Sequence, residues 1–322
     1  MKKKTYNVLI VGAGAIGAFY DTPDSDNVLT HAHAFAKHKG FELLGFVDIK
    51  KEKAREASEI WGGKCFDNIE QAFEEYSIDI VSVCVPDEFH YKILKMIADY
   101  PVKIIFAEKP LTKTLPEAKE IVLLYSKKNI PMCVNYRRRF LPEIEEIKES
   151  IDGNELGKFI TGTGYYGKGL LHNGSHLIDL IIYLIGNKVV KQKVIQSQCD
   201  YYENDPSVSA TLFFEGNRPF YLQCVDCNYF AIFEVDFIFE KGRFRLTNTG
   251  LTIEYFSVKK NNVFKDYSFL EKVEEASTSL FQSLFWSAEN IYNFLTNNEE
   301  LKCSMIDAFE TMLLCDKIKS GA

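Results

Sequence analysis

Short apolar runs alternate with amphipathic segments over the first 135 residues of the chain. The runs are continuous or nearly continuous in apolar character, which is typical of parallel strands buried on both faces. We expect strands at 8–11, 43–47, 78–85, 104–107 and 132–134. Helical periodicity predicts helices between them, at 51–61, 69–76, 89–100 and 116–128. Strands that alternate with helices in this way predict a doubly wound parallel sheet.

The pattern changes after Arg139. It predicts helices at 142–151 and 175–185, and then a stretch rich in β-branched and aromatic residues from 189 to 258. Turns containing glycine divide that stretch at 215–217, 240–242 and 248–250, which indicates an antiparallel meander. The tail, from about 283 to 318, returns to helix. The sequence therefore predicts an α/β chain, with a Rossmann domain over residues 1–135 and an α+β domain with an open, mostly antiparallel sheet over 136–322.

The segment from Phe230 to Phe239 is apolar on both faces of its expected strand. An open sheet has a face to cover, and a subunit interface would explain the pattern. Helices of the same chain would explain it equally well. We expect the second domain to bind substrate and to carry the contacts of a homo-oligomer.

The composition is that of an ordinary globular protein, with 46% hydrophobic and 26% charged residues. The net charge of -7 argues against a nucleic-acid-binding protein, which would show a clustered basic excess. No run reaches the roughly 18 apolar residues that a membrane span needs. The lysines at 2–4 precede an apolar run, as in a signal peptide, but that run contains a glycine motif needed for function, so we expect a cytoplasmic protein. The eight scattered cysteines predict reduced thiols, and neither a disulfide framework nor a metal site.

The strand at 8–11 runs into the motif Gly12-Ala13-Gly14-Ala15-Ile16-Gly17. In this position the motif predicts a dinucleotide-binding loop that leads into a helix. Gly12 permits a tight turn, Gly14 lets the pyrophosphate approach the backbone, and Gly17 lets helix and strand pack closely. The sequence therefore predicts a nicotinamide dinucleotide as cofactor.

Asp48, at the end of the second strand, is the acid expected to bind the adenosine ribose. Its carboxylate would repel a 2′-phosphate, which favours NAD over NADP, although Lys50 and Lys51 follow it directly. Asp48 lies further from the glycine loop than usual because the polar segment from Tyr20 to Thr30 is inserted in the first crossover. We expect this insertion to border the substrate site, so that its deletion changes substrate affinity more than NAD affinity. His31 and His33 follow it and are expected at the surface, with the cleft as the alternative.

Five motifs in this order resemble the Gfo/Idh/MocA oxidoreductases, which act mostly on sugars, polyols and nucleotide sugars. They are the glycine loop with Asp48, Val83-Cys84-Val85-Pro86 with His90, Glu108-Lys109-Pro110, Asn135-Tyr136-Arg137-Arg138-Arg139-Phe140, and Gly174-Ser175-His176-Leu177-Ile178-Asp179. The resemblance implies an NAD-dependent dehydrogenase or reductase of a secondary alcohol or ketone. It implies further cofactor contacts from Ala15, Ile16, Val85, Pro86, His90 and Glu108. Two alternatives stay open: a redox-neutral enzyme that uses NAD transiently for epimerisation, elimination or glycoside cleavage, and a non-catalytic NAD-linked sensor.

Lys109 and His176 are the main catalytic candidates. In the family, the lysine that matches Lys109 contacts the reacting hydroxyl or carbonyl, where a lowered pKa would help it to exchange a proton. His176 begins a helix, which disfavours the imidazolium and leaves a neutral ring to accept the hydroxyl proton. A core histidine is the alternative, and Asp179 lies where it could orient the ring. His172 stands where many relatives have Asp or Asn, and we interpret it as a substrate-contacting or proton-relay residue.

Tyr136, Arg137 and Arg139 are the remaining substrate candidates, together with Asp179. The arginines follow the last strand of the first domain, with Arg137 and Arg139 on one side of an extended segment. One of them would hold an anionic group of the substrate, such as a phosphate or a carboxylate. Salt bridges between the domains are the alternative. The expected partner is a small sugar or nucleotide sugar, and we expect neither nucleic acid nor membrane as a partner.

Overall fold

The computed structural model describes residues 4–186 and 189–321. The chain divides into two compact units, Met1–Phe140 with Phe281–Phe309, and Leu141–Leu280 with Glu310–Ala322. This division differs from the expected boundary at residue 135 because the segment Phe281–Phe309 packs with the first unit. Among the described residues, no helix is both long and apolar enough to cross a membrane.

The first unit is built on a six-stranded parallel sheet in the order β3-β2-β1-β4-β5-β6. Its strands are β1 (Tyr6–Val11), β2 (Phe41–Val47), β3 (Lys64–Phe66), β4 (Ile80–Val83), β5 (Ile104–Ala107) and β6 (Met132–Val134). The chain reverses direction across the sheet between β1 and β4, and the carboxyl ends of strands at such a switch point form a ligand-binding crevice. The expected doubly wound Rossmann sheet is confirmed.

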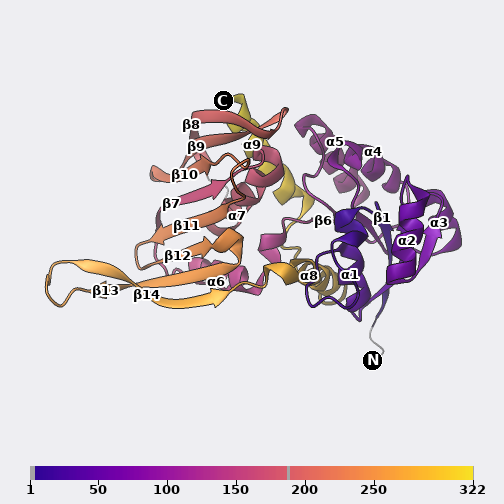
Figure 1. Cartoon of the computed structure of the whole chain (residues 1–322), viewed down its shortest axis with the longest axis horizontal. Helices are drawn as coiled ribbons and strands as arrows, with labels where there is room; N and C mark the ends of the chain where they lie inside the picture. The colour runs from indigo at the N-terminus through magenta and orange to yellow at the C-terminus, as the bar shows by residue number, and fades with distance from the viewer. Residues whose placement is uncertain (1–3, 187–188, 322) are drawn as a thin grey trace. The chain divides into compact units, whose positions relative to one another are not determined.

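Helices flank this sheet. They are α1 (His31–Lys37), α2 (Lys51–Trp61), α3 (Ile69–Glu75), α4 (Asp87–Ile97), α5 (Leu115–Lys128) and α8 (Ser283–Asn297). In the first unit, α4 lies beside α5 and α1 lies beside α8 (Figure 1). The Tyr6 hydroxyl donates a hydrogen bond to the Leu295 carbonyl oxygen at 2.8 Å, so α8 completes the first unit although it follows the second unit in sequence.

The crossover after β1 differs from the expectation. The glycine loop leads into a single wide turn, η1 (Ala15–Phe19), where we expected a regular helix. Helix α1 begins only after the inserted segment, at His31, and the side chain of Thr30 caps it by accepting a hydrogen bond from the backbone N–H of His33. A helix therefore does follow the loop, but only as this one turn, and it resumes at His31 because the insertion breaks the crossover into two pieces.

The second unit is built on an eight-stranded sheet in the order β14-β13-β12-β11-β7-β10-β9-β8. Its strands are β7 (Phe159–Tyr166), β8 (Val189–Tyr202), β9 (Asp205–Phe214), β10 (Arg218–Cys224), β11 (Phe233–Phe239), β12 (Gly242–Thr247), β13 (Thr252–Lys260) and β14 (Ser268–Ser277). Neighbouring strands are antiparallel except for β7 and β10, which run parallel. The expected open, mostly antiparallel sheet is confirmed, with β13 and β14 drawn out into a long hairpin (Figure 1).

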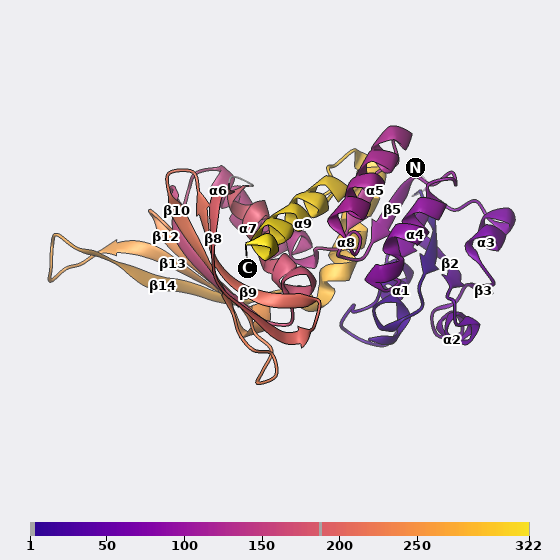
Figure 2. The same ribbon diagram turned by 90° about the horizontal axis from the view of Figure 1, so that it is seen from above.

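One face of this sheet is covered by helices of the same chain. They are α6 (Pro142–Asp152), α7 (Ser175–Ile185) and the part of α9 (Met305–Ser320) that belongs to this unit (Figure 2). Along β11, buried Phe233, Val235, Phe237 and Phe239 alternate with partly exposed residues. Helices from within the chain therefore account for the apolar side chains of β11 on this face, and the opposite face remains open to solvent in the single chain.

Candidate functional site

The glycine loop joins the carboxyl end of β1 to η1. Gly12 has a φ of +100°, and a Cβ on it would lie 2.7 Å from the backbone of Cys84, so only glycine fits there. A Cβ on Gly17 would lie 2.2 Å from the carbonyl oxygen of Gly12. A Cβ on Gly14, by contrast, would meet nothing within 4 Å. The loop is thus tightly packed at both ends and open at Gly14, which is the arrangement a pyrophosphate needs to reach the backbone.

Asp48 ties the end of β2 to this loop. Its Oδ2 accepts a hydrogen bond from the backbone N–H of Ala13, and its Oδ1 accepts one from the backbone N–H of Lys50, both at 2.8 Å. Asp48 also lines the same cavity as Gly12 and Gly14. The structure therefore brings the predicted ribose ligand and the predicted phosphate loop together. A carboxylate in this place accepts hydrogen bonds from ribose hydroxyls and repels a 2′-phosphate.

The cavity beside the loop has a volume of about 650 Å³, which is within the range of cofactor sites. It is lined by the loop, the end of β2, the start of α3 and side chains of α4. Ile49 is 97% exposed and Phe89 45% exposed at its wall, so apolar surface is available for a flat ring. Lys50 and Lys53 line it as well, whereas Lys51 forms an ion pair with Asp67. The residues present fit a dinucleotide, with Val85 and Pro86 on the side of β4.

His90, a predicted cofactor contact, is buried behind this wall. Its Nδ1 lies 2.8 Å from the carbonyl oxygen of Pro110, and its Nε2 lies 2.9 Å from that of Val85. The ring therefore links α4 and the end of β4 to the segment after β5. His90 is not among the residues that line the cavity, so it supports the site from behind, because both ring nitrogens face backbone carbonyl groups.

Glu108 and Lys109 follow β5 at the carboxyl edge of the sheet. Oε1 of Glu108 lies 3.0 Å from Nε2 of His31 and accepts a hydrogen bond from Nδ2 of Asn135 at 2.6 Å. Its Oε2 accepts a longer one, 3.3 Å, from the backbone N–H of Lys109. The Glu108 carboxylate is thus directed into the first unit, where it anchors the residue that carries the expected catalytic ammonium group.

The arginine motif after β6 forms a short 3-10 turn, Arg137–Phe140, and the expected extended segment is wrong. Arg139 is buried, and its Nη1 donates hydrogen bonds to Oδ1 of Asp307 and to the carbonyl oxygen of Lys302, at 2.9 and 3.1 Å. This ion pair lies within the first unit and uses Arg139 to hold the returning segment. Tyr136 is buried as well, while Arg137 is partly exposed.

In the second unit, His172 lies on the turn η3 (Leu170–Gly174) directly before α7. Its Nδ1 lies 2.7 Å from Oδ2 of Asp205, the first residue of β9. The ring stacks on Tyr202 with a centroid separation of 4.0 Å, and 28% of the His172 side chain is exposed. A carboxylate against Nδ1 fixes the tautomer that leaves Nε2 as the proton acceptor, as in other carboxylate–imidazole pairs.

Asp205 also organises the backbone of this turn. It accepts hydrogen bonds from the N–H groups of Leu171 and His172 at 2.9 Å. Burial alone would raise the pKa of Asp205, but the hydrogen bonds from the His172 ring and from these N–H groups outweigh it and lower the pKa below its ordinary value. Asp205 therefore stays ionised opposite His172.

His176 and Asp179 lie on the first turns of α7. Asp179 is buried, and its Oδ1 accepts a hydrogen bond from the Thr311 hydroxyl of α9 at 3.2 Å. Helix α7 begins at Ser175, so His176 occupies the helix start that the sequence predicted. Within the second unit, His172 and His176 therefore lie on either side of Gly174.

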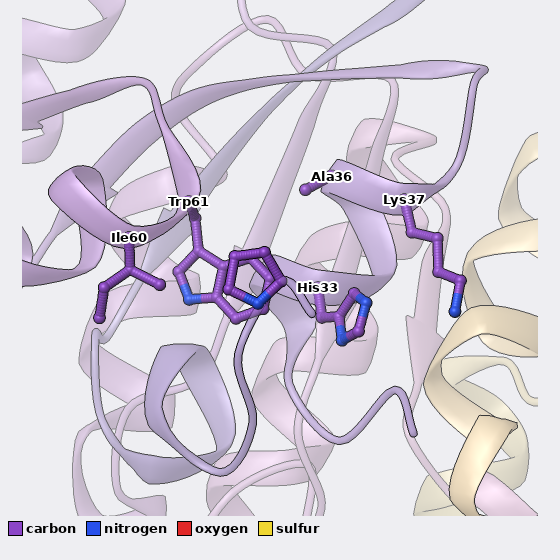
Figure 3. Close-up of a pocket in the computed structure, with 6 residues that line it drawn as sticks. His33, Ala36, Lys37, Ile60 and Trp61 are labelled. Carbon is purple, nitrogen blue, oxygen red and sulfur yellow. The ribbon is translucent and has the colours of Figure 1, made fainter. Parts of the chain in front are cut away.

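A second, smaller cavity of about 270 Å³ lies beside the insertion in the first unit (Figure 3). Trp61 and His33 form its floor, with ring centroids 5.2 Å apart, and Trp61 Nε1 donates a hydrogen bond to the Ala18 carbonyl oxygen at 2.8 Å. His33 and His31 are both buried, so the expected surface position of these histidines is wrong. They are buried because the insertion folds back over the start of α1.

The sequence of the first unit matches a known family. Residues 6–136 match the family model described as an oxidoreductase family with an NAD-binding Rossmann fold, Gfo/Idh/MocA. The match covers less than half of the chain. The glycine loop, Asp48, Lys109 and the start of the arginine motif all fall inside the matched range.

Two relatives match longer stretches of the chain. Inositol 2-dehydrogenase from Corynebacterium glutamicum is 29% identical over 204 residues, which cover 59% of this chain and 57% of the relative. D-glucoside 3-dehydrogenase from Escherichia coli is 25% identical over 245 residues, covering 66% of this chain and 67% of the relative. The chain thus matches little more than half of the inositol enzyme.

Solved structures show the same fold over nearly the whole chain. A UDP-N-acetylglucosamine 3-dehydrogenase from Acidithiobacillus ferrooxidans superposes with a TM-score of 0.78 at 14% identity, covering 98% of this chain and 97% of the other. A putative myo-inositol dehydrogenase from Sinorhizobium meliloti gives 0.78 at 18% identity, with the same two coverages. At these identities the likeness establishes the fold alone.

Sequence reasoning missed three residues, two in the second unit and one in the first. Asp205 and Tyr202 flank a hairpin turn far from His172 in sequence, and no local spacing marks them. Asp21 lies in the insertion, where its carboxylate accepts hydrogen bonds at 2.6 Å from the backbone N–H of Leu29 and from the Thr30 hydroxyl. An acidic residue ahead of a Thr helix cap was a usable signal for Asp21.

Proposed function

We propose that the chain is an NAD-dependent dehydrogenase or reductase that acts on a secondary alcohol or ketone of a sugar, polyol or nucleotide sugar. The observation that carries the proposal is the cavity of about 650 Å³ in the first unit, where the open backbone at Gly14 and the Asp48 carboxylate face the same space. The family match and the names of the relatives support the substrate class. A dehydrogenase from Bordetella pertussis with the same fold was solved in complex with NADH and UDP-GlcNAcA, at a TM-score of 0.80 and 15% identity.

NAD is the proposed cofactor, in preference to NADP. When bound, NAD supplies a carbon that accepts or returns a hydride. Gly12, Gly14 and Gly17 would hold its pyrophosphate, and Asp48 its adenosine ribose. Both oxygens of Asp48 accept hydrogen bonds from backbone N–H groups, one in the loop and one at Lys50. These bonds would hold the negative charge of Asp48 where the 2′-phosphate of NADP would bind.

Proton transfer is assigned to this chain's own side chains. Lys109 follows β5 at the carboxyl edge of the sheet and would donate or accept the proton of the reacting oxygen. His176, at the start of α7, would share this task as a neutral imidazole. His172 would relay a proton through Nε2, since Asp205 lies against its Nδ1.

The test is turnover with NAD and a panel of sugars, polyols and nucleotide sugars, followed by the absorbance of the reduced cofactor. We expect one member of the panel to reduce NAD. Lys109→Ala should keep NAD affinity and lower kcat by about 10²–10⁴-fold, the usual contribution of a general acid or base. Full activity in Lys109→Ala, or no turnover of any member in either direction, contradicts the proposal.

The His172–Asp205 pair favours a second candidate, a redox-neutral reaction with transient use of NAD, because such a reaction needs an acid–base group beyond those for hydride transfer. This candidate predicts that a sugar product forms from the same panel while no reduced cofactor accumulates. Chromatography of the sugars detects the product. Accumulation of reduced cofactor equal to product decides for the dehydrogenase.

We further propose that the open face of the eight-stranded sheet joins copies of this cytoplasmic chain into a homo-oligomer. The strands of this sheet carry exposed large apolar side chains, namely Ile160, Val190, Ile195, Tyr221, Phe269 and Val273. Light scattering should give a mass that is a multiple of the 36.9 kDa chain, and a monomer at micromolar concentration contradicts this point.

A further inference from the structure

His31 is fully buried at the first position of α1, in the interior of the first unit. Its Nε2 lies 3.0 Å from Oε1 of Glu108, and its Nδ1 lies 2.7 Å from the hydroxyl oxygen of Ser82 on β4. The ring packs on Phe106 of β5 with a centroid separation of 4.6 Å. Burying a carboxylate next to a histidine costs free energy unless the two groups form a charged, hydrogen-bonded pair.

The hydrogen bonds around the ring have a geometry that suits a charged His31 beside a charged Glu108. The Glu108 carboxylate only accepts, so Nε2 carries a proton. The Ser82 hydroxyl can donate to Sγ of Cys84, 3.6 Å away, and its oxygen can then accept a hydrogen bond from an N–H at Nδ1 of His31. A doubly protonated ring therefore satisfies every group in this set of hydrogen bonds.

The charges around the pair agree with this assignment. Burial lowers the pKa of His31, but the Cys84 side chain and the Glu108 carboxylate raise it well above its ordinary value. Burial raises the pKa of Glu108, but His31, the Asn135 amide and the charge of Lys109 together lower it. The Glu108 charge also acts on Arg137. Burial lowers the pKa of the Arg137 guanidinium, and the nearby Glu108 carboxylate offsets part of that effect.

Lys109 lies between two anchored neighbours. On one side, Glu108 is held by His31 and Asn135, and it accepts the backbone N–H of Lys109 itself. On the other side, the Pro110 carbonyl oxygen lies 2.8 Å from Nδ1 of His90. A buried histidine therefore holds the residue on each side of Lys109: His31 of α1 contacts the Glu108 side chain, and His90 of α4 contacts the Pro110 backbone.

The insertion places His31. Asp21 accepts hydrogen bonds from the Leu29 N–H and the Thr30 hydroxyl, and its Oδ2 lies 2.7 Å from Nδ1 of His33. Thr30 in turn caps α1. The inserted segment thus fixes the start of the helix that carries His31, and its role is to support the edge of the sheet near Lys109.

We propose that His31 is a positioning residue for Lys109: its imidazolium holds the Glu108 carboxylate in place and balances the negative charge beside the lysine. The proposal rests on the proposed function, which assigns proton transfer to Lys109. In this arrangement His31 sets how strongly Glu108 stabilises the ammonium form of Lys109, with Arg137 as the other nearby cation and Asn135 as the neutral partner.

The test measures the reactivity of the Lys109 amine, which needs no substrate. Acetic anhydride labels deprotonated amines, and peptide mass spectrometry gives the labelling of Lys109 relative to exposed Lys119 in the full chain. In His31→Gln, Asn135 and Arg137 still keep the Glu108 carboxylate ionised, but the positive charge of His31 that balanced it is gone. The ammonium form of Lys109 is then more stable, so its labelling should slow by about tenfold, the effect of one pKa unit. Glu108→Gln should accelerate it. The double variant should return to within about threefold of the parent chain.

A purely structural role for His31 would move all three variants in the same direction, and that result, or labelling unchanged in both single variants, overturns the proposal. His38→Gln is the matched control, because it breaks a comparable pair between a buried histidine and Glu289, 2.8 Å apart, at the other end of α1. NAD affinity should stay within about threefold in His31→Gln and in His38→Gln. If the chain turns over no substrate at all, the labelling result still decides this point separately from the proposed function.

Discussion

At the residue scale, the site is held by carboxylates that bond to backbone groups or to buried histidines. Asp48 fixes the glycine loop through the Ala13 N–H, Asp205 fixes the turn that carries His172, and Glu108 fixes the backbone of Lys109. We propose a second task for each carboxylate: ribose binding for Asp48, tautomer control for Asp205 and charge balance for Glu108. Charge-neutral substitutions can separate the two tasks.

Asp48→Asn should change cofactor preference more than stability. Asparagine still accepts the Ala13 N–H, but it loses the charge that binds the ribose hydroxyls and repels a 2′-phosphate. A hydrogen bond to a charged group is worth about 1.5–3 kcal/mol, so the ratio of NADP to NAD dissociation constants should fall about 10–100-fold. Calorimetric titration of both cofactors measures it. Asp67→Asn, on the same cavity wall, is the control, and an equal effect there would show that net charge alone is responsible.

The His31–Glu108 pair predicts a pH window of stability. The pKa of His31 is raised on folding from about 6.5, so its contribution is full below that value and is lost as pH rises toward the folded pKa. The pKa of Glu108 is lowered from about 4.5, so its contribution is full above that value and is lost as pH falls. The parent chain should exceed His31→Gln in free energy of unfolding by about 3–5 kcal/mol between these two values, with a smaller difference on either side. Urea unfolding across pH measures this, and a pH-independent difference contradicts the charged pair.

Several of these residues were visible in the sequence, and others were not. The glycine loop, Asp48 and Lys109 follow apolar strands directly, so the strand pattern alone places them at one edge of a parallel sheet. His31, His90 and Glu108 were also named from the sequence, but their contacts were not predicted, because their partners come from other strands and helices. The groups that a buried imidazole contacts depend on how α1 and α4 pack. No local pattern in the sequence predicts that packing.

At the element scale, the hairpin of β8 and β9 supports the turn η3. Tyr202 and Asp205 pair across the hairpin turn; the Tyr202 ring stacks on the His172 ring, and the Asp205 carboxylate lies against its Nδ1. The bounds of α7 and of β5 were predicted correctly, since their apolar patterns are complete. Strand β7 was missed, because Gly162 and Gly164 interrupt its pattern, although it lies in the middle of the eight-stranded sheet.

Asp205→Asn should loosen η3 without unfolding the sheet. The variant loses the charged partner of the His172 ring, and the free energy of unfolding should fall by about 1.5–3 kcal/mol at neutral pH. Because the folded pKa of Asp205 is lowered, this difference should shrink as pH falls below the ordinary value of about 3.8. Thermal unfolding and the nitrogen NMR shifts of His172 measure both effects. Glu203→Gln, exposed in the same hairpin turn, is the control, and an equal loss there contradicts the role of Asp205.

At the scale of the whole molecule, the chain leaves the first unit at Leu141 and returns to it at Phe281. The return adds α8 and brings Asp307 to the buried Arg139, at 2.9 Å. Sequence periodicity predicted helix in this tail but could not show which core it joins. That choice depends on contacts such as the one from His38 to Glu289, which no pattern within the tail reveals.

A chain that ends at Leu280 should therefore lose the first unit as well as the tail. It keeps every strand of the Rossmann sheet but leaves Arg139 buried without Asp307, which costs about 3–5 kcal/mol. We expect hydrogen exchange in β1 and β5 to become fast and NAD binding to disappear. A chain that ends at Ser320 is the control. Retention of slow exchange in the shorter chain would show that residues 4–140 are stable alone.

The central claim is that this chain moves a hydride between a carbinol carbon of a sugar-like substrate and a nicotinamide cofactor held in the first unit. Deuterium transfer tests it most directly. A substrate found by turnover is prepared with deuterium on the reacting carbon, and the cofactor is analysed by mass spectrometry. We predict one deuterium in the reduced cofactor and none of it in water. Product that forms while the label stays on the sugar or passes to solvent would contradict the account.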